Sequence, residues 1–171
     1  LTAASDNTIK VWDLNTKACK ATLSTHVGLP TSFAFDQAGS TMLSSGRDQL
    51  VNVWRCADWK LQSSIAVLEP VEGLAILQSS SSGGGGGGGA NDAPLLFVSA
   101  GGESGLLRTW DLRSGRCVKK ESVAATKAEA VPGLSRLLLM DGSGDDGDGV
   151  LFGRPTLLAV TTDHNLVFHD V

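Results

Sequence analysis

Three residues of this chain could together perform nucleophilic chemistry: His26, Ser44 and Asp48. A serine hydroxyl becomes a nucleophile when a histidine removes its proton and a carboxylate orients that histidine, as in many hydrolases. Asp48 is, however, followed six residues later by Trp54, within the run TMLSSGRDQLVNVW at 41–54. An indole adds an N–H donor and a large apolar body, which suits a buried structural bracket better than a proton shuttle. These residues therefore allow two interpretations, a catalytic triad and a structural hydrogen-bond network.

A pattern that recurs along the chain favours the structural interpretation. Each copy is a short apolar strand, a polar turn and a second alternating strand that ends in an aromatic residue or a histidine. The copies are LTAASDNTIKVWDL (1–14), MLSSGRDQLVNVWRC (42–56), LFVSAGGESGLLRTWDL (96–112) and LLAVTTDHNLVFHDV (157–171). The six-residue separation recurs at Asp6–Trp12 and Asp163–His169, whereas the third copy has an extra turn residue and Ser104 where the aspartate would fall. Because the spacing recurs without a Ser–His pair, it does not depend on a nucleophile.

Further strand-like runs lie between these copies and predict the fold. They occur at residues 31–35, 61–68, 71–78, 117–123 and 133–141. Trp12 and Trp54 are 42 residues apart, and four short strands per such period, joined by Gly, Asp and Asn turns, are typical of a β-propeller blade. Helical periodicity with caps is absent. We therefore predict an all-β fold, part of one propeller with about three and a half four-stranded blades. The units lie near 1–23, 24–68, 69–123 and 124–171.

Two segments fit no strand and are predicted to be disordered loop insertions. The tract at 79–92 is serine- and glycine-rich and cannot bury side chains. The acidic segment at 141–149 lacks the order of a calcium-binding loop, because Asp146 and Phe152 stand where glycine and glutamate are required. No Gly-Lys-Ser/Thr follows the glycine tract, so it is not a phosphate loop. We expect no metal and no cofactor.

Composition bounds the remaining function classes. The 171 residues carry a formal net charge of −4, and 42% are hydrophobic. This balance gives no reason to expect a nucleic-acid surface, and no apolar run approaches the length of a membrane span. Leu1 stands where an initiator methionine would be, so we expect a piece of a longer chain. Three widely spaced cysteines (Cys19, Cys56 and Cys117) fit a reducing intracellular compartment.

The VWDL and TWDL endings, each following a polar turn, resemble the WD40-repeat superfamily over essentially the whole chain. In that family a turn aspartate bonds a histidine of the preceding loop, and the histidine reaches a Ser or Thr and the Trp. The resemblance implies a complete structural tetrad in the second unit: His26, Ser44, Asp48 and Trp54. It implies partial tetrads of Thr2, Asp6 and Trp12 in the first unit, Trp110 alone in the third, and Asp163 in the fourth, where His169 replaces the Trp.

A closer resemblance is to the transducin beta-like protein 3 family. It is carried by TMLSSGRD (41–48), PVEGLAIL (70–77), LLRTWDLRSGRCV (106–118) and TTDHNLVFHDV (161–171), in that family's order. The resemblance implies a non-catalytic scaffold of the small-subunit processome that acts in ribosome biogenesis. Such a protein would be located in the nucleus, in the nucleolus. Its partners would be protein subunits of a large ribonucleoprotein assembly, and any contact with pre-rRNA or snoRNA would be indirect. No membrane and no small-molecule substrate are expected.

Two other function classes stay open at this point. One is another WD40 adaptor, such as a ubiquitin-ligase substrate receptor or a G-protein-β-like signalling scaffold. The other is an enzyme, which would have to use the Ser–His–Asp residues. One candidate binding residue is Arg47, placed by the resemblance at the rim of a blade, where its guanidinium could take a carboxylate or phosphate or simply be solvated. Lys119 and Lys120 are expected to protect an outer strand edge.

Overall fold

The computed structural model describes residues 1–77, 95–101, 105–122, 133–140, 156–161 and 166–170, and within them all regular structure is β-strand. The insertions predicted at 79–92 and 141–149 lie outside the described residues. The first seven strands are β1 (Thr2–Ala3), β2 (Ile9–Trp12), β3 (Cys19–Leu23), β4 (Pro30–Phe35), β5 (Thr41–Gly46), β6 (Leu50–Arg55) and β7 (Lys60–Ala66). The others are β8 (Val71–Leu77), β9 (Leu96–Gly101), β10 (Leu106–Asp111), β11 (Arg116–Ser122), β12 (Leu134–Met140), β13 (Thr156–Thr161) and β14 (Leu166–Asp170).

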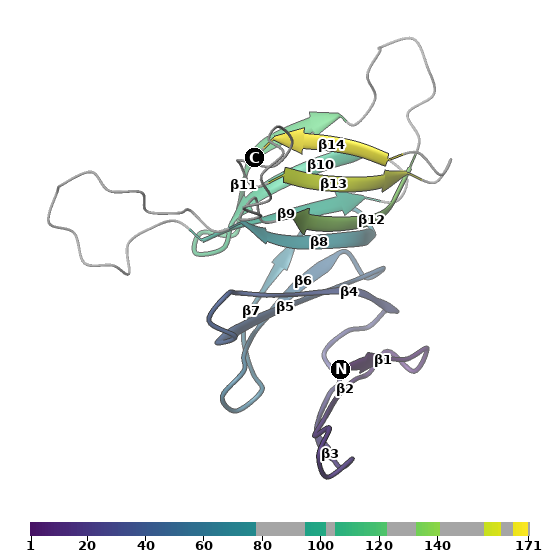
Figure 1. Ribbon diagram of the computed structural model, residues 1–171, viewed down its shortest axis with the longest axis vertical. Coiled ribbons are helices and arrows are strands. Elements are labelled where there is room, and N and C mark those ends of the chain that lie inside the picture. The colour runs from purple at the N-terminus through teal and green to yellow at the C-terminus, as the bar shows by residue number, and fades with distance from the viewer. Residues whose placement is uncertain (78–94, 102–104, 123–132, 141–155, 162–165, 171) are drawn as a thin grey trace, which may run out of the picture.

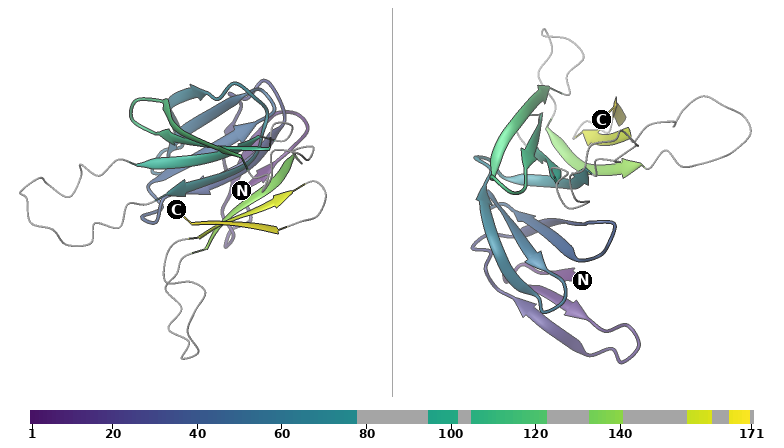
Figure 2. Two further views of the ribbon diagram at one scale, coloured as in Figure 1. Left: turned by 90° about the horizontal axis from the view of Figure 1, so that it is seen from above. Right: turned by 90° about the vertical axis from the view of Figure 1, so that its left-hand side faces the viewer.

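These strands form four antiparallel sheets in which spatial order follows chain order. We call them blade 1 (β1–β3), blade 2 (β4–β7), blade 3 (β8–β11) and blade 4 (β12–β14). Figure 1 shows the blades in succession from the N-terminus to the C-terminus, and Figure 2 shows that they follow an arc. The first strands of blades 2, 3 and 4 lie side by side along its inner edge. The chain is therefore part of a β-propeller, as the sequence predicts.

The core lies between blades rather than within any one of them. Side chains alternate along each strand, so successive residues face opposite neighbours: Met42 packs toward blade 1, and Leu43 packs toward blade 3. The buried cluster between blades 2 and 3 consists of Leu43, Val51, Val53, Ile65, Val67, Val71, Leu74, Ile76, Phe97 and Trp110. Similar clusters join blade 1 to blade 2 and blade 3 to blade 4. Each sheet thus depends on the next one to cover its apolar face.

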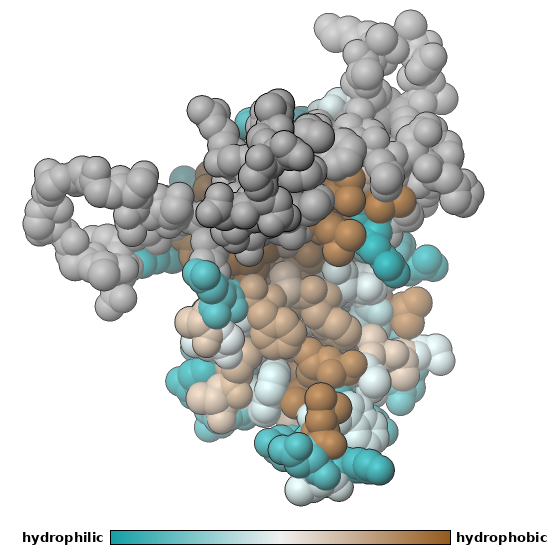
Figure 3. Space-filling view, in the orientation of Figure 1, coloured by the Kyte–Doolittle hydropathy of each residue, from teal (hydrophilic) through white to brown (hydrophobic). Residues whose placement is uncertain are grey.

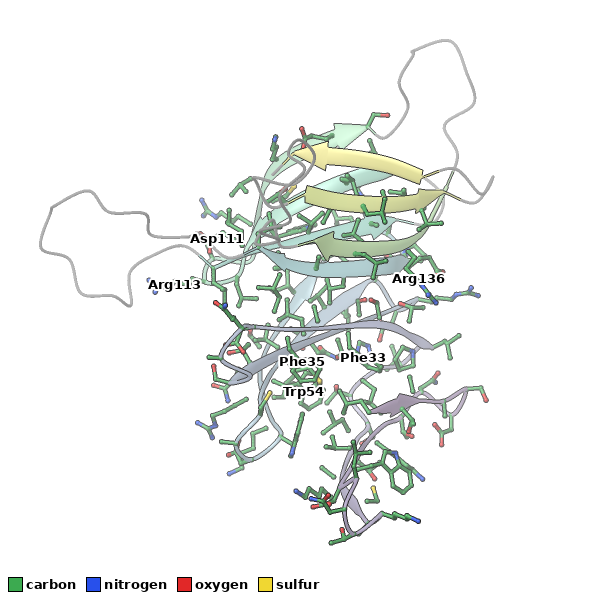
Figure 4. All side chains as sticks on the ribbon, viewed as in Figure 1. Phe33, Phe35, Trp54, Asp111, Arg113 and Arg136 are labelled. Atoms are coloured by element: carbon green, nitrogen blue, oxygen red, sulfur yellow. The ribbon has the colours of Figure 1, made fainter. Side chains whose placement is uncertain are left out.

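The face of blade 2 that is directed toward blade 1 is only partly covered. Phe33 packs at the edge of the cluster between blades 1 and 2, whereas Phe35 is 46% exposed. Figure 3 shows an apolar area over β4 and β5 on this side, and Figure 4 shows both phenylalanines there beside Trp54. Blade 1 has three described strands and blade 2 has four, so the innermost strand of blade 2 has less cover.

The aspartate that follows the Trp has a local role in two blades. Asp13 accepts the backbone N–H groups of Asn15 and Thr16, at 2.9 and 3.0 Å. These bonds, led by that from Thr16, together with Lys20 lower the pKa of Asp13 to about 2. Asp111 accepts the N–H groups two and three residues ahead in the same way, which lowers its pKa. The aspartate therefore holds the turn to the outermost strand and is not part of the His26 network.

Glycine at position 73 lets the inner strands of blades 3 and 4 approach each other. A Cβ atom there would lie 2.7 Å from the Cβ and 2.8 Å from the backbone nitrogen of Leu137. Both atoms are fixed to β12, so a side chain could be fitted only by moving the strand. Gly73 is thus a contact point for the curvature of the arc.

We predict that Gly73→Ala lowers the free energy of unfolding by about 1–3 kcal/mol, the usual cost of overpacking. Denaturant unfolding of the full-length protein measures this change. Leu137→Ala serves as the control background, because it removes side-chain atoms beyond Cβ and leaves the two clashing atoms in place. If Leu137→Ala restored the stability of the Gly73→Ala variant, strand separation would not be the cause.

Candidate functional site: a buried Ser-His-Asp-Trp network

The four residues of the predicted complete tetrad come from three elements of blade 2 and the loop before it. His26 lies in the loop that leads into β4, Ser44 lies on β5, Asp48 lies in the turn to β6, and Trp54 lies on β6. In the antiparallel register Ser44 is opposite Asn52, and Met42 is opposite Trp54. Because side chains alternate, Ser44, Asn52 and Trp54 share the face that looks toward blade 1.

The structure brings the four side chains into one hydrogen-bonded chain. Trp54 Nε1 lies 2.8 Å from Ser44 Oγ, and because an indole only donates, the serine accepts this bond. Ser44 Oγ then donates its own proton to His26 Nε2, 2.8 Å away. The other ring nitrogen, Nδ1, consequently carries the imidazole proton and donates to Asp48 Oδ2 at 2.8 Å. Every N–H or O–H donor of the four side chains, from Trp54 on β6 to the His26 ring beside the turn, therefore has an acceptor.

Additional polar groups, which the repeat pattern of the sequence does not reveal, complete this network. Asn52 Nδ2 donates to His26 Nε2 at 3.2 Å and to Thr25 Oγ1 at 3.0 Å. Ser64 Oγ on β7 donates to Asn52 Oδ1 at 2.6 Å. Asp48 Oδ2 also accepts the backbone N–H of Val27 at 3.0 Å. A polar residue two positions before Trp54, on the buried face of a strand, was the signal for Asn52.

Gly46 gives the network the space it needs. A Cβ atom at this position would lie 2.9 Å from the Leu29 carbonyl oxygen, 3.0 Å from Asp48 Oδ1 and 3.3 Å from His26 Nδ1. Backbone oxygen atoms in a hydrogen-bonded turn cannot yield cheaply, so any larger residue would displace the loop. The sequence Ser-Ser-Gly at the end of β5 therefore serves the site as well as the strand.

The connectivity is that of a Ser–His–Asp triad, but the setting prevents nucleophilic attack. A catalytic serine needs a hydroxyl that a substrate can reach. Ser44 is completely buried, His26 is 4% exposed, and the Ser44 oxygen already accepts the Trp54 N–H. The arrangement can fix a loop against a sheet but offers no place for a reacting carbonyl. In the part of the chain that the structure describes, His, Cys, Asp and Glu side chains do not gather in threes that could hold a metal ion. The same residues form no helical segment that could span a bilayer.

Blade 3 contains a shorter version of this hydrogen-bond network. Trp110 Nε1 donates to Ser99 Oγ at 2.9 Å, and both residues are buried. The expectation that Trp110 stands alone is therefore wrong. The extra turn residue in this copy hides the match, although FVSAG at 97–101 parallels MLSSG at 42–46. Phe97 stacks on the Trp110 ring with a centroid distance of 6.1 Å.

An ion pair takes the place of the histidine in blade 3. Glu69 lies in the loop before β8 and pairs with Arg108 on β10; both side chains are mostly buried. Arg108 is opposite Ser99 in the register, as Asn52 is opposite Ser44. A Cβ atom on Gly101, which corresponds to Gly46, would overlap the Glu69 carboxyl group. Glu69 thus occupies the space that His26 fills in blade 2.

The other predicted site residues are placed as follows. Trp12 Nε1 donates to Thr2 Oγ1 at 2.9 Å, but Trp12 is 38% exposed, whereas Trp54 is 2% exposed. Asp6 accepts bonds from the hydroxyl and backbone N–H of Thr8, and these lower its pKa. Arg47 projects from the turn before Asp48, and its Nε donates to Glu72 Oε1 of blade 3 at 3.2 Å. Asp163 lies outside the described residues, as does the side chain of His169.

Comparison with known proteins identifies relatives along nearly the whole chain. The sequence pattern of the family described as "WD domain, G-beta repeat" matches residues 17–55. The chain is similar to transducin beta-like protein 3 of Mus musculus (32% identity over 168 residues, 98% of this chain) and of Bos taurus (34% over 170 residues, 98% of this chain). The human protein of the same name is 30% identical over 157 residues, or 92% of this chain. The matched part is 19%, 19% and 17% of these relatives, so the chain spans less than a fifth of their length.

We predict a graded loss of stability when the blade 2 network is shortened. Ser44→Ala should cost about 1 kcal/mol, and Asp48→Ala about 1.5–3 kcal/mol because it leaves a buried imidazole N–H without its charged acceptor. Trp54→Ala should cost most, about 3–5 kcal/mol, since it also opens a cavity between blades 1 and 2. Denaturant unfolding of the full-length protein gives all three values.

Asp58→Ala is the matched control for Asp48→Ala. Asp58 is also an ion-paired aspartate of blade 2, and its Oδ2 lies 2.6 Å from Arg55 Nη2. Both side chains, however, lie at the surface. Exposed pairs contribute little, so this variant should unfold like the wild type. A generic ester hydrolysis assay accompanies the unfolding curves. Hydrolysis that disappears in Ser44→Ala while stability is unchanged would contradict the structural role of the network.

Proposed function

Because the chain belongs to the WD40-repeat family and is similar over nearly its whole length to transducin beta-like protein 3, we propose that it is part of a non-catalytic scaffold. The observation that carries this proposal is the closed state of the Ser–His–Asp network: its serine is buried and already accepts the Trp54 N–H. The residues that resemble a hydrolase are therefore committed to holding blade 2 together. Stacked sheets of this kind supply rigid outer surfaces for binding.

We propose further that the scaffold serves ribosome biogenesis as part of the small-subunit processome, and that it is located in the nucleolus. The motif-by-motif resemblance to transducin beta-like protein 3 supports this assignment, together with the identity of 30–34% to proteins of that name. The partners would be protein subunits of a large ribonucleoprotein assembly, and contact with pre-rRNA or snoRNA would be indirect. The acidic balance of the chain, with a formal net charge of −4, agrees with binding through proteins.

We predict that the tagged full-length protein localises to nucleoli and sediments with large particles that contain pre-rRNA. Depleting it should lower the ratio of small-subunit to large-subunit mature rRNA, because an assembly step of the small subunit would be missing. Fluorescence imaging, gradient sedimentation and RNA blotting measure these outcomes.

The Ser44→Ala variant is the control for catalysis. It removes the hydroxyl that is bonded to His26, at a modest cost in stability, and should restore rRNA processing in depleted cells. A tagged protein that sediments as a free chain, with unaltered rRNA ratios after depletion, would contradict the assignment to ribosome biogenesis.

A further inference from the structure

Leucine and valine residues are exposed where the loops before β4 and β8 reach the surface. Val27 is 81% exposed, Leu68 is 73% exposed and Leu29 is 37% exposed. Leu68 also has a φ of 69°, a left-handed conformation that is unfavourable for a leucine. An apolar side chain held in water by a strained backbone gains nothing for folding. Such outliers point to a role in binding.

Backbone hydrogen bonds join these loops into one surface. The N–H of Arg47 donates to the Leu29 carbonyl at 3.0 Å, and the N–H of Val67, next to Leu68, donates to the Gln49 carbonyl at 2.9 Å. Both loops are therefore attached to the turn between β5 and β6. The His26–Asp48 pair lies directly beneath that turn and holds it rigid. Rigid, pre-organised groups bind with a smaller loss of entropy.

The charged groups on this surface are unbalanced. The Arg47 side chain is 61% exposed, and its contact with the other described residues is made by Nε, which donates to Glu72 Oε1 at 3.2 Å. Glu72 lies at a register shift in β8, just before Gly73, where β8 touches the backbone of Arg136. Arg136 is exposed and extends away from β12 (Figure 4), and it has no acidic partner among the described residues. Two guanidinium groups thus accompany one carboxylate. The Asp48 side chain is turned inward and is 1% exposed.

We propose that this surface, the apical ridge (Val27, Leu29, Arg47, Leu68, Glu72 and Arg136), binds an acidic protein segment that carries an apolar side chain. Carboxylates of the segment would pair with the free N–H groups of Arg47 and with Arg136, which suit carboxylates geometrically. The apolar side chain of the segment would cover Leu68. This inference rests on the proposed scaffold function and names the chemistry of one partner.

The composition of the apical ridge favours a protein segment over RNA. Single-stranded RNA is bound by aromatic side chains that stack on bases and by a continuous cationic groove. The ridge has no aromatic residue, its three apolar residues are aliphatic, and the Glu72 carboxylate beside Arg47 would repel a phosphate backbone. Exposed aliphatic side chains next to arginine are suited to an acidic, apolar peptide.

The test is selection from a randomised displayed peptide library on the full-length protein, followed by affinity measurements on a selected peptide. We expect enrichment of sequences with Asp or Glu beside Leu, Ile or Phe. The double variant Arg47→Glu/Arg136→Glu should lower the affinity by about tenfold or more, because like charges oppose the peptide. Leu68→Asn should lower it by about tenfold, as expected for a central apolar anchor.

Leu68→Asn also separates binding from folding. Asparagine tolerates the left-handed conformation better than leucine, so this variant should unfold at the same or a higher denaturant concentration while its binding falls. Lys119→Glu on β11 is the matched control for charge, and it should retain the full affinity. Selected peptides that are basic, that bind the ridge variants as well as the wild type, or that are absent would overturn the proposal. So would tighter binding of a uridine oligonucleotide than of the selected peptide.

Sedimentation of the double variant distinguishes the two proposals. If it no longer binds the acidic peptide but still enters particles with pre-rRNA, the apical ridge binds a partner that assembly does not require, and the scaffold function stands. If the wild type itself stays outside such particles, the ribosome-biogenesis assignment fails, whatever the peptide result.

Discussion

The contact between the apolar faces of successive sheets is the interaction on which this structure depends. Blades 2 and 3 have apolar side chains on both faces, because neighbouring positions such as Met42 and Leu43 face opposite sides of one strand. A sheet of this kind cannot be stable alone in water, since one face would always be exposed. Stacking blades along an arc covers both faces in turn. The curvature then requires close approach at the inner edge, which Gly73 permits.

Loops that enter each blade must be held against a sheet by polar side chains that pair with one another. Blade 2 meets this requirement with His26 and Asp48, and blade 3 meets it with Glu69 and Arg108. Both solutions place a polar side chain over a glycine at the end of the second strand, and both retain a Trp–Ser bond beneath it. The shared requirement is thus a paired polar group in a fixed space, and the imidazole is one way of filling it.

The same burial that stabilises the blades leaves their outer surfaces for the proposed scaffold function. Since the chemically active side chains of blade 2 bond to one another, binding must use residues that remain exposed around them. The turn between β5 and β6 joins these two roles. Asp48 faces inward to His26, while Arg47, its neighbour, faces outward and pairs with Glu72 of the next blade. The internal network therefore fixes the position of a charged group at the surface.

The sequence by itself determined the repeat, most of the strands and the four residues of the blade 2 tetrad. Alternation and the Asp-to-Trp spacing are local properties, and they survive whatever the sheets pack against. Only the tertiary structure decided which polar groups meet: Asn52 joins His26, and Glu69 pairs with Arg108 from a loop of different length. It also decided that Trp54 is buried while Trp12 remains partly exposed. The physical reason is that these outcomes depend on how one sheet covers another, and residues in different sheets are distant in the sequence.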